Sequence, residues 1–489
     1  MPLLIGIDAG STVTKTVVFD LTGEVVATAS QRVALQYPRP RHVERDQDQL
    51  WEAVCSVTRR ALEGLDSSEV IGIGITSHGD GIYMVDADIR PTRPGIMSLD
   101  SRGEDVVHAW NARGVSDALF DITGQRPWAS APSVLLAWLA QHEPDVVVAS
   151  AWALPAKDML KARMTGEVST EPTEASVSFT NVLTQEYDLA IFPLIGVPEA
   201  VRLLPPVVPS DAVAGTVTAQ AAAAMGVPEG IPVAASAHDV DCSALGSGVA
   251  RVGVASVVAG SFSINQVISQ EPKTGQAWFA RNFVLPGRWM NMSISPTSSA
   301  NMEWFVQHLC AADVAAAPAG TDPLSFIDRE VAAVMDDPSE VVFTPFLFGS
   351  LVGDGRPATF TGLRAWHTRG HVLRAIMEGV ALGHQSHVAA LASAFAFDRV
   401  RLTGGATKSN VWCQIFADAF GLPVEIPHHE ESGAWGAALL AGVAVGAFPD
   451  VVSAAETSVQ VARSYLPSAE GGARLDRRAW ADLSGSAEL

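Results

Sequence analysis

The sequence predicts an α/β protein made of two similar lobes with a ligand cleft between them. Near the start, residues 3–26 form two β-rich runs around a tight Gly-Ser-Thr turn, and residues 252–265 repeat the order of strand, Gly-Ser turn and strand. Between these segments, residues 70–75 form an apolar run typical of a buried strand. Because the second half is built like the first, we expect two related lobes that meet near residues 246–253.

The first segment predicts an antiparallel meander with a turn that has the chemistry of a phosphate site. Gly10, Ser11 and Thr12 would direct backbone N–H groups and hydroxyls toward one point. Many hairpins contain Gly and Ser without binding a ligand, so an ordinary turn is the alternative. Residues 46–49 have the form of a capping box, and apolar residues at helical spacing follow them. A helix is therefore expected to begin there.

Polar residues follow the buried strand at 70–75. His78, Gly79, Asp80 and Gly81 stand at its carboxyl end, where α/β sheets bind their ligands. The two glycines would let the backbone approach a ligand closely. This loop is therefore expected to form part of a binding site.

A third loop, residues 403–410, lies between a strand at 400–402 and a helix that ends at Gly421. Its Gly-Gly pair offers bare backbone against which a flat ligand can lie. The loop matches neither the Rossmann nor the P-loop pattern, which excludes both assignments. An ordinary strand-to-helix turn is again the alternative.

Composition limits the classes of partner. The 489 residues include 53 acidic and 32 basic side chains, for a net charge of −21, and 48% of them are hydrophobic. This composition excludes disorder for most of the chain, and an acidic surface argues against nucleic acids and anionic membranes. The longest uncharged run, residues 433–448, is too short to span a membrane and predicts a buried helix. We expect a cytoplasmic protein with reduced cysteines and a small-molecule ligand; a homodimer is compatible with the sequence.

Beyond these patterns, the chain resembles the FGGY family of carbohydrate kinases, within the actin-like ATPase superfamily. The matching segments are residues 156–160, 164–167, 204–210, 236–239, 358–363 and 371–378, of which the last two form the family's C-terminal signature. The resemblance implies two actin-like, ribonuclease H-like lobes, each a mixed sheet flanked by helices, with the active site in the cleft. It places the sugar-binding and catalytic lobe at residues 1–247 and the nucleotide-binding lobe at residues 248–489.

The resemblance implies an ATP-dependent kinase that transfers phosphate to a primary hydroxyl and uses Mg²⁺. Asp239 would be the general base, and Asp8 would hold Mg²⁺ through water. The expected contacts to ATP and its phosphates are Gly10, Ser11, Thr12, Lys15, Gly260, Ser261, Gly404, Gly405, Ala406 and Ser409. The expected contacts to the sugar are His78, Asp80, Asp100, Arg102 and Asp239. A structural Asp100–Arg102 pair and a helix N-cap at Asp239 are the alternatives for those residues.

Within the family, residues 295–305 and 343–350 resemble L-xylulose kinases, whereas residues 78–81 resemble polyol kinases such as erythritol kinases. Ser98 stands where glycerol kinases carry a substrate-facing Trp, which disfavours glycerol. Gly349, Ser350 and Leu351 stand where xylulose kinases carry Gly-Glu-Arg, which disfavours D-xylulose. A ketopentose is therefore expected, with L-xylulose favoured and a polyol as the alternative. An actin-like ATPase without a sugar substrate is a weaker alternative, because no long partner-binding β-domain is present.

Overall fold

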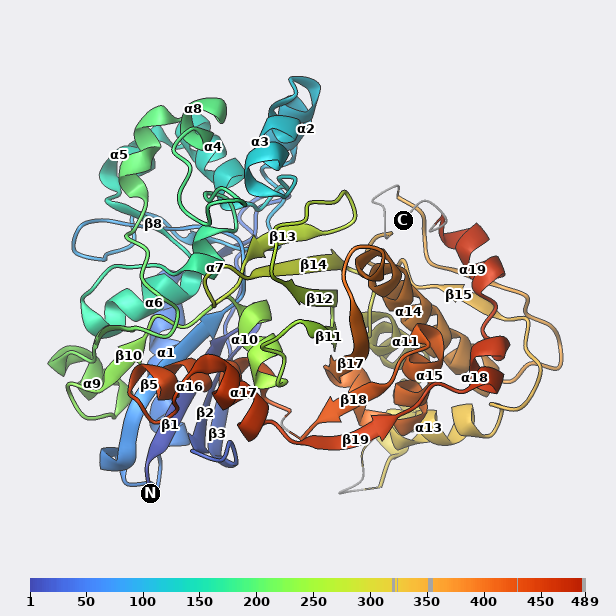
Figure 1. The fold of residues 1–489 in the computed structure, drawn as a ribbon. Helices are drawn as coiled ribbons and strands as arrows, with labels where there is room; N and C mark the ends of the chain where they lie inside the picture. Colours follow the sequence, from blue (N-terminus) through green and yellow to red (C-terminus); the bar gives the residue numbers. More distant parts are fainter. Residues whose placement is uncertain (319–321, 323, 351–354, 429, 486–489) are drawn as a thin grey trace.

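Two mixed β-sheets, one from each half of the chain, form the centres of two lobes in the computed structural model (Figure 1). The structure describes residues 1–489 except 319–321, 323, 351–354, 429 and 486–489. Leu351, used above against D-xylulose, therefore lies outside the described residues.

The first sheet has the strand order β3 (Val25–Arg32), β2 (Val13–Asp20), β1 (Leu3–Ala9), β5 (Val70–Ser77), β10 (Pro232–Ala234) and β9 (Val213–Thr216). The second has the order β13 (Phe279–Asn282), β14 (Trp289–Ser295), β12 (Ser263–Ser269), β11 (Gly253–Ala259), β17 (Phe397–Thr403), β18 (Val424–Pro427) and β19 (Val461–Tyr465).

The two sheets share one pattern of strand pairing. β1 pairs antiparallel with β2 and parallel with β5, and β5 pairs parallel with β10. In the second half, β11 pairs antiparallel with β12 and parallel with β17, and β17 pairs parallel with β18. Residues 10–12 and 260–262 are the matching turns. The prediction of two related α/β lobes is confirmed.

Helix α16 (Ser432–Ala444) joins the two halves. It follows the second sheet in sequence, yet it packs against β1 and β5 of the first sheet and against α10 (Asp239–Gly246). A Cβ on Gly436 would lie 1.9 Å from the Cys242 carbonyl oxygen, so glycine is required at this contact. The buried helix expected near residues 433–448 is confirmed. The division at residue 247 stays a prediction.

The predicted helix near residue 46 is α1 (Gln47–Ala61). The Asp46 carboxylate accepts hydrogen bonds from the backbone N–H groups of Asp48 and Gln49, as an N-cap does. This helix packs on β2 and β3.

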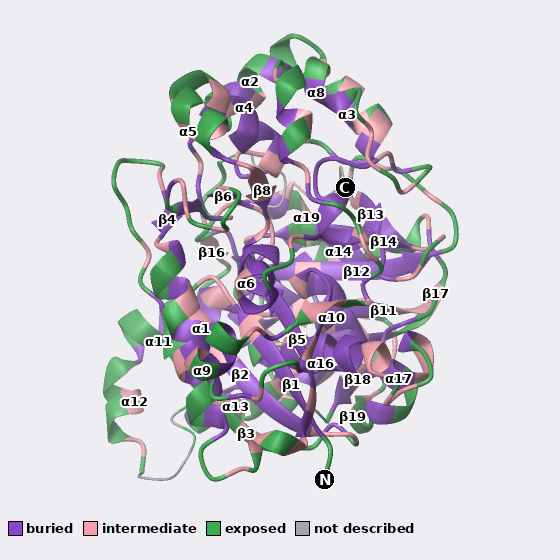
Figure 2. Cartoon of the chain, turned by 90° about the vertical axis from the view of Figure 1, so that its left-hand side faces the viewer, coloured by how far each residue is buried: buried purple, intermediate pink, exposed green. Residues whose placement is uncertain are grey.

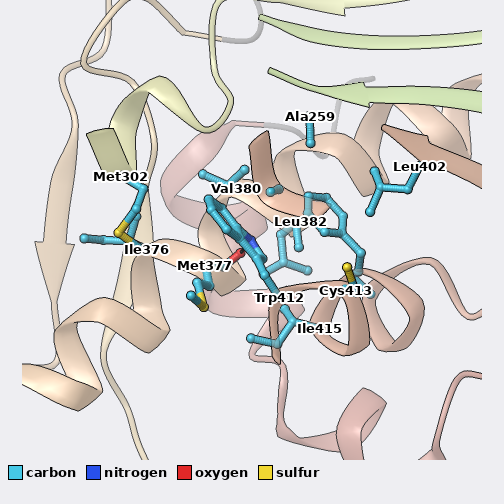
Figure 3. Close-up of a cluster of buried hydrophobic side chains, with 14 of the residues drawn as sticks. Ala259, Met302, Ile376, Met377, Val380, Leu382, Leu402, Trp412, Cys413 and Ile415 are labelled. Carbon is cyan, nitrogen blue, oxygen red and sulfur yellow. Dashed lines mark hydrogen bonds between the residues drawn. The ribbon is translucent and has the colours of Figure 1, made fainter. Parts of the chain in front are cut away.

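Two helices, α14 (Arg369–Ala392) and α15 (Asn410–Phe420), build the core of the second lobe. Figure 3 shows residues from several elements gathered around Trp412, including Met302 of α11 (Ala300–Leu309) and Ile376. The Trp412 indole N–H donates a hydrogen bond to the Met377 carbonyl at 3.0 Å. This bond satisfies the indole N–H that burial would otherwise leave without a partner.

A helical cap stands above the first sheet (Figure 1). Its helices are α2 (Glu104–Ala112), α3 (Val115–Thr123), α4 (Pro132–His142), α5 (Pro144–Ala149) and α8 (Ile191–Leu194). Helix α6 (Ala156–Thr165) packs on β5, β9 and β10 of the first sheet, and α7 (Pro172–Ala175) contacts β13. Many residues of α2 and α5 in the cap are exposed, whereas the inner strands of both sheets are largely buried (Figure 2). The edge strands β3, β9 and β19 are exposed or half-buried.

The remaining elements complete the layers around the sheets. They are β4 (Glu44–Arg45), β6 (Tyr83–Val85), β7 (Gly95–Ile96), β8 (Trp152–Leu154), β15 (Val342–Thr344), β16 (Thr359–Thr361), α9 (Ala219–Met225), α12 (Ala311–Ala316), α13 (Ser325–Ala332), α17 (Val451–Ser458), α18 (Ala469–Arg474) and α19 (Arg477–Ser484). All four cysteines are buried and free. In the described part of the chain, no helix combines the length and apolar character that a membrane crossing requires.

Candidate active site

Two cavities are lined in part by the segment that runs from the turn at residues 10–12 into β2, one by Ser11 and the other by Lys15. We call the first the Asp239 cavity; it holds about 300 Å³ and is lined by Ser11, His78, Gly79, Asp80, Ser98, Leu99, Trp128, Ser130, His238, Asp239, Val240, Phe262, Ile264, Phe279, Arg281, Met292 and Ile294. We call the second the Lys15 cavity; it holds about 390 Å³ and is lined by Lys15, Leu402, Thr403, Gly404, Gly405, Thr407, Lys408, Ile426, Pro427, His428, Glu430, Glu431, Ala462 and Arg463. Both volumes are in the range of small-molecule sites.

Asp239 is the first residue of α10, and its carboxylate faces the cavity that carries its name. The Oδ1 atom accepts a hydrogen bond from the Val240 backbone N–H at 2.8 Å and lies 2.9 Å from Nδ1 of His238. Burial alone would raise the pKa of Asp239, but His238 holds that pKa below its usual value. The carboxylate is therefore ionised and can accept a proton. His238, not Asp239, occupies the N-cap position.

The loop before Asp239 is fixed by hydrogen bonds to neighbouring elements. Strand β10 ends at Ala234, and beyond it the Ser236 hydroxyl accepts a bond from the Ile75 backbone N–H at 3.0 Å. The Ala237 carbonyl accepts one from the Thr76 hydroxyl at 2.9 Å. The hydroxyls of Ser236 and Thr76 thus hold this loop beside β5 after the backbone pairing of β10 has ended, and they set the position of the Asp239 carboxylate.

His238 lines the cavity and was not among the predicted site residues. Burial lowers the pKa of His238, but the carboxylates of Glu174 and Asp239 outweigh burial and raise it to about 9. The ring lies so close to Gly79 that a Cβ at residue 79 would be 2.0 Å from Nε2. The sequence motif Ser-Ala-His-Asp contained His238, and its place next to the predicted base was the available signal.

The predicted residues His78 and Asp80 both line the Asp239 cavity. Nε2 of His78 lies 3.0 Å from the Tyr83 hydroxyl, and burial followed by the charge of Arg45 lowers the pKa of His78 to about 4. His78 is therefore neutral at pH 7. Asp80 has a left-handed backbone with φ 57°, and burial raises the pKa of its carboxyl group. The absence of a side chain at Gly79 leaves space for the His238 ring, as well as for the ligand that we expected to approach this glycine.

Asp100 and Arg102, also predicted to bind the sugar, are buried and absent from the lining of the cavity. Asp100 accepts hydrogen bonds from Nε of Arg102 at 2.9 Å and from the Val43 N–H at 2.6 Å. Nη2 of Arg102 donates to Glu44 at 2.7 Å. This geometry corresponds to the structural pair considered above, and the neighbouring Ser98 and Leu99 line the cavity instead.

Arg281 on β13 reaches the cavity from the second lobe, and no local sequence pattern marks it as a site residue. Its Nε donates to Gln125 at 3.0 Å, and its guanidinium lies 5.3 Å from the ring centre of Trp128. Around it, Phe262, Ile264, Phe279, Met292 and Ile294 form an apolar wall. The cavity therefore has polar groups from the first lobe facing an apolar wall from the second, with Arg281 between them.

Asp8 is the penultimate residue of β1, close enough to Asp239 for their charges to interact. Its carboxylate has no hydrogen bond or ion pair within the described residues, and burial followed by the charge of Asp239 raises its pKa to about 7. The charge of Lys15 lowers this pKa but does not cancel the rise, and a bound cation would stabilise the ionised carboxylate further. Among the described residues, no group of three or more His, Cys, Asp or Glu side chains is arranged to hold a metal ion.

Ser11 of the turn at residues 10–12 lines the Asp239 cavity, and Lys15 of β2, which begins directly after the turn, lines the Lys15 cavity. Arg45, fully buried below the turn, donates to the Gly10 carbonyl at 3.1 Å and to the Ser11 carbonyl. Lys15 lies 2.7 Å from each carboxylate oxygen of Glu431.

Loops of the second lobe supply the rest of the Lys15 cavity. Gly404 and Gly405 line it as predicted, whereas Ala406 is fully buried and the Ser409 hydroxyl accepts a bond from the Trp412 N–H as the N-cap of α15. The carbonyl of Gly260 accepts a hydrogen bond from the Ser299 hydroxyl at 2.6 Å. Thr12, Gly260 and Ser261 lie on the two turns but do not appear in the lining of either cavity.

An ionised carboxylate thus faces one cavity, and a Gly-rich loop with a lysine faces the other. The arrangement can hold an alcohol in one cavity and a phosphorylated ligand in the other. Phosphoryl transfer depends on this kind of positioning, together with a group that accepts the alcohol proton.

Comparison with known proteins identifies the same chemistry. The model of the N-terminal domain of the FGGY family of carbohydrate kinases matches residues 3–246, and that of the C-terminal domain matches residues 255–445. The chain is 32% identical over 469 residues to the L-xylulose/3-keto-L-gulonate kinase of Escherichia coli (strain K12), covering 95% of this chain and 92% of that protein. It is 28% identical over 470 residues to the erythritol kinase of Brucella abortus (strain 2308), covering 91% and 88%. The crystal structure of xylulose kinase from Rhodospirillum rubrum superposes with a TM-score of 0.86 at 28% identity, covering 99% of this chain and 98% of that one.

Proposed function

The chain belongs to the FGGY family of carbohydrate kinases, which are ATP-dependent sugar phosphotransferases, and we propose on this premise that it phosphorylates a primary hydroxyl of a ketopentose, with L-xylulose favoured. One observation carries the proposal: Asp239 and Ser11 of the turn at residues 10–12 line one cavity, and Lys15, on the strand that directly follows this turn, lines the other. A sugar hydroxyl and a nucleotide phosphate would meet at that turn.

In the proposed reaction the sugar lies in the Asp239 cavity and ATP in the Lys15 cavity. The hydroxyl oxygen forms a bond to the γ-phosphorus, the bond from that phosphorus to the β-phosphate oxygen breaks, and Asp239 accepts the hydroxyl proton. The backbone of the turn would donate to the phosphates, and the apolar wall would exclude the water that could otherwise accept the phosphoryl group.

Asp8 is the residue we propose for Mg²⁺. The Asp8 carboxylate has no hydrogen bond or ion pair within the described residues, and its pKa is raised. A bound cation would stabilise its ionised form. When bound, Mg²⁺ supplies charge neutralisation for the phosphates.

The choice of L-xylulose over a polyol is supported by the L-xylulose kinase relative, and the erythritol kinase relative supports the polyol alternative. A panel of acceptors separates them. ADP release with ATP and Mg²⁺ is measured for L-xylulose, D-xylulose, erythritol and glycerol. We expect kcat/KM for L-xylulose to exceed that for glycerol and erythritol by about tenfold or more. A higher kcat/KM for erythritol would establish the polyol alternative, and ADP release independent of every acceptor would refute the sugar kinase proposal.

A further inference from the structure

Two nitrogen-rich side chains from opposite lobes meet in the Asp239 cavity. His238 comes from the loop before α10, and Arg281 comes from β13. Both side chains are only 5% exposed, and Nη1 of Arg281 lies 3.4 Å from Nε2 of His238. Two buried groups of this kind lie so close together only where something compensates their charge.

The other nitrogens of both side chains already have partners. Nδ1 of His238 is 2.9 Å from the Asp239 carboxylate, and Nε of Arg281 donates to Gln125 at 3.0 Å. Nη2 of Arg281 reaches the Asp80 carboxylate at 3.4 Å. Within the described residues, the polar contact of Nη1 is therefore limited to the His238 ring, and both residues line the cavity.

The charges around His238 favour its doubly protonated form. Glu174 of α7, Asp239 of α10 and Asp80 of the loop after β5 present carboxylates to the ring, and Arg281 of β13 opposes them. The net effect raises the pKa of His238 to about 9. In that form Nε2 carries a proton, and a guanidinium has donors but no acceptor. The two facing nitrogens are then both donors, and neither satisfies the other.

We propose that Nε2 of His238 and Nη1 of Arg281 together hold one substrate oxygen that accepts hydrogen bonds and carries no proton. The ketone oxygen of an open-chain ketose has this chemistry, and so does a carboxylate oxygen of a sugar acid. A hydroxyl in that place needs a further acceptor for its own proton. The inference rests on the proposed kinase function and deepens it, because it assigns the choice between ketose and polyol to these two residues.

The test compares three compounds that differ at this oxygen: L-xylulose, xylitol and 3-keto-L-gulonate. For the wild type we expect kcat/KM for L-xylulose to exceed that for xylitol by about tenfold or more. Arg281→Gln should lower kcat/KM for L-xylulose about tenfold and that for xylitol less than about threefold, with KM for ATP unchanged. A still higher kcat/KM for 3-keto-L-gulonate, with a larger loss in Arg281→Gln, would assign the oxygen to a carboxylate.

Two further variants control the experiment. Arg126→Gln changes an exposed arginine that pairs with Asp117 and Gln276 outside the cavity, and it should leave all three values unchanged. If Arg281→Gln lowers the melting temperature, Arg281→Lys serves as the second variant, because it keeps the charge without the planar fork. Its ratio of kcat/KM for L-xylulose to that for xylitol should lie between those of the wild type and Arg281→Gln.

Calorimetry without ATP separates the two proposals. If no compound supports ADP release, the proposed function fails. Tighter binding of L-xylulose than of xylitol, lost in Arg281→Gln, would still support the two-donor site. Equal binding of both compounds by the wild type, or an equal loss for both in Arg281→Gln, would overturn it.

Discussion

At the scale of single residues, the carboxylate of Asp239, which we propose as the base, depends on the histidine before it. Nδ1 of His238 lies 2.9 Å from Asp239, so each group stabilises the charged form of the other. A base with a lowered pKa stays ionised across the physiological range. Its contribution is then to orient the alcohol and to accept the proton late in the transfer, as expected for a loose phosphoryl transition state.

This pair predicts a pH dependence of stability. Folding raises the pKa of His238 from 6.5 to about 9, so its contribution is fully present below about pH 6.5 and is lost as pH rises through about 9. We expect the unfolding free energy to fall across this window, and to fall less in His238→Gln. Urea unfolding at several pH values measures it. Folding also raises the pKa values of Asp8 and Glu174 to about 7, from 3.8 and 4.5. These two groups therefore lower the unfolding free energy as pH rises through about 7, below the range in which His238 acts. Parallel profiles for wild type and variant above pH 7 would show that His238 contributes nothing.

At the scale of elements, Lys15 of β2 is held by Glu431, which precedes α16. Both side chains are about 30% exposed, at 31% and 29%, and both line the same cavity. A phosphate that binds there competes with the Glu431 carboxylate for the ammonium group and is repelled by it.

Glu431→Gln should therefore lower KM for ATP by up to about fivefold, the scale of a partly exposed ion pair. KM for the sugar should not change. Glu430→Gln removes an adjacent carboxylate of the same cavity and is the matched control. A higher KM for ATP in Glu431→Gln than in the control would mean that Glu431 positions Lys15 for the phosphate instead of competing with it.

Local patterns in the sequence predicted the elements well. The cap at Asp46, the strand at residues 70–75 and the repeat of two strands around a Gly-Ser turn all depend on neighbours in the chain, and the structure confirms them. The site was predicted only in part. Arg281 meets Asp80 from 201 residues away, and no local pattern encodes that contact. Asp100 and Arg102 are neighbours in sequence, but which side of the loop faces the cavity depends on packing against Glu44 and Val43.

At the scale of the whole molecule, the two lobes share one hydrophobic cluster. It includes Leu4 and Phe19 of the first sheet, Ile268 and Met292 of the second, and residues of α10 and α16. The cavities lie where these lobes meet. Because the lobes share a core, we expect the molecule to unfold as a unit, and we expect a change at the shared helices to be felt in both lobes.

Gly436→Ala tests this coupling. Its Cβ would lie 1.9 Å from the Cys242 carbonyl, so α10 and α16 must separate, at a cost of about 1–3 kcal/mol or more. Gly472→Ala, at a helical position where the nearest atom is 3.6 Å away, is the control and should be neutral or slightly stabilising. Calorimetry should show one transition moved to lower temperature. Two transitions, with one of them unmoved, would mean that the lobes unfold independently.

The central claim is that Asp239 accepts the proton of a sugar hydroxyl while ATP transfers its γ-phosphate. The most direct measurement is sugar-dependent ADP release by the wild type and Asp239→Asn, with ATP binding measured in parallel. The account predicts one ADP per sugar phosphate for the wild type, and a fall in kcat by about 10²–10⁴ in Asp239→Asn with ATP binding nearly unchanged. Turnover in the variant above about a third of the wild-type value would contradict it.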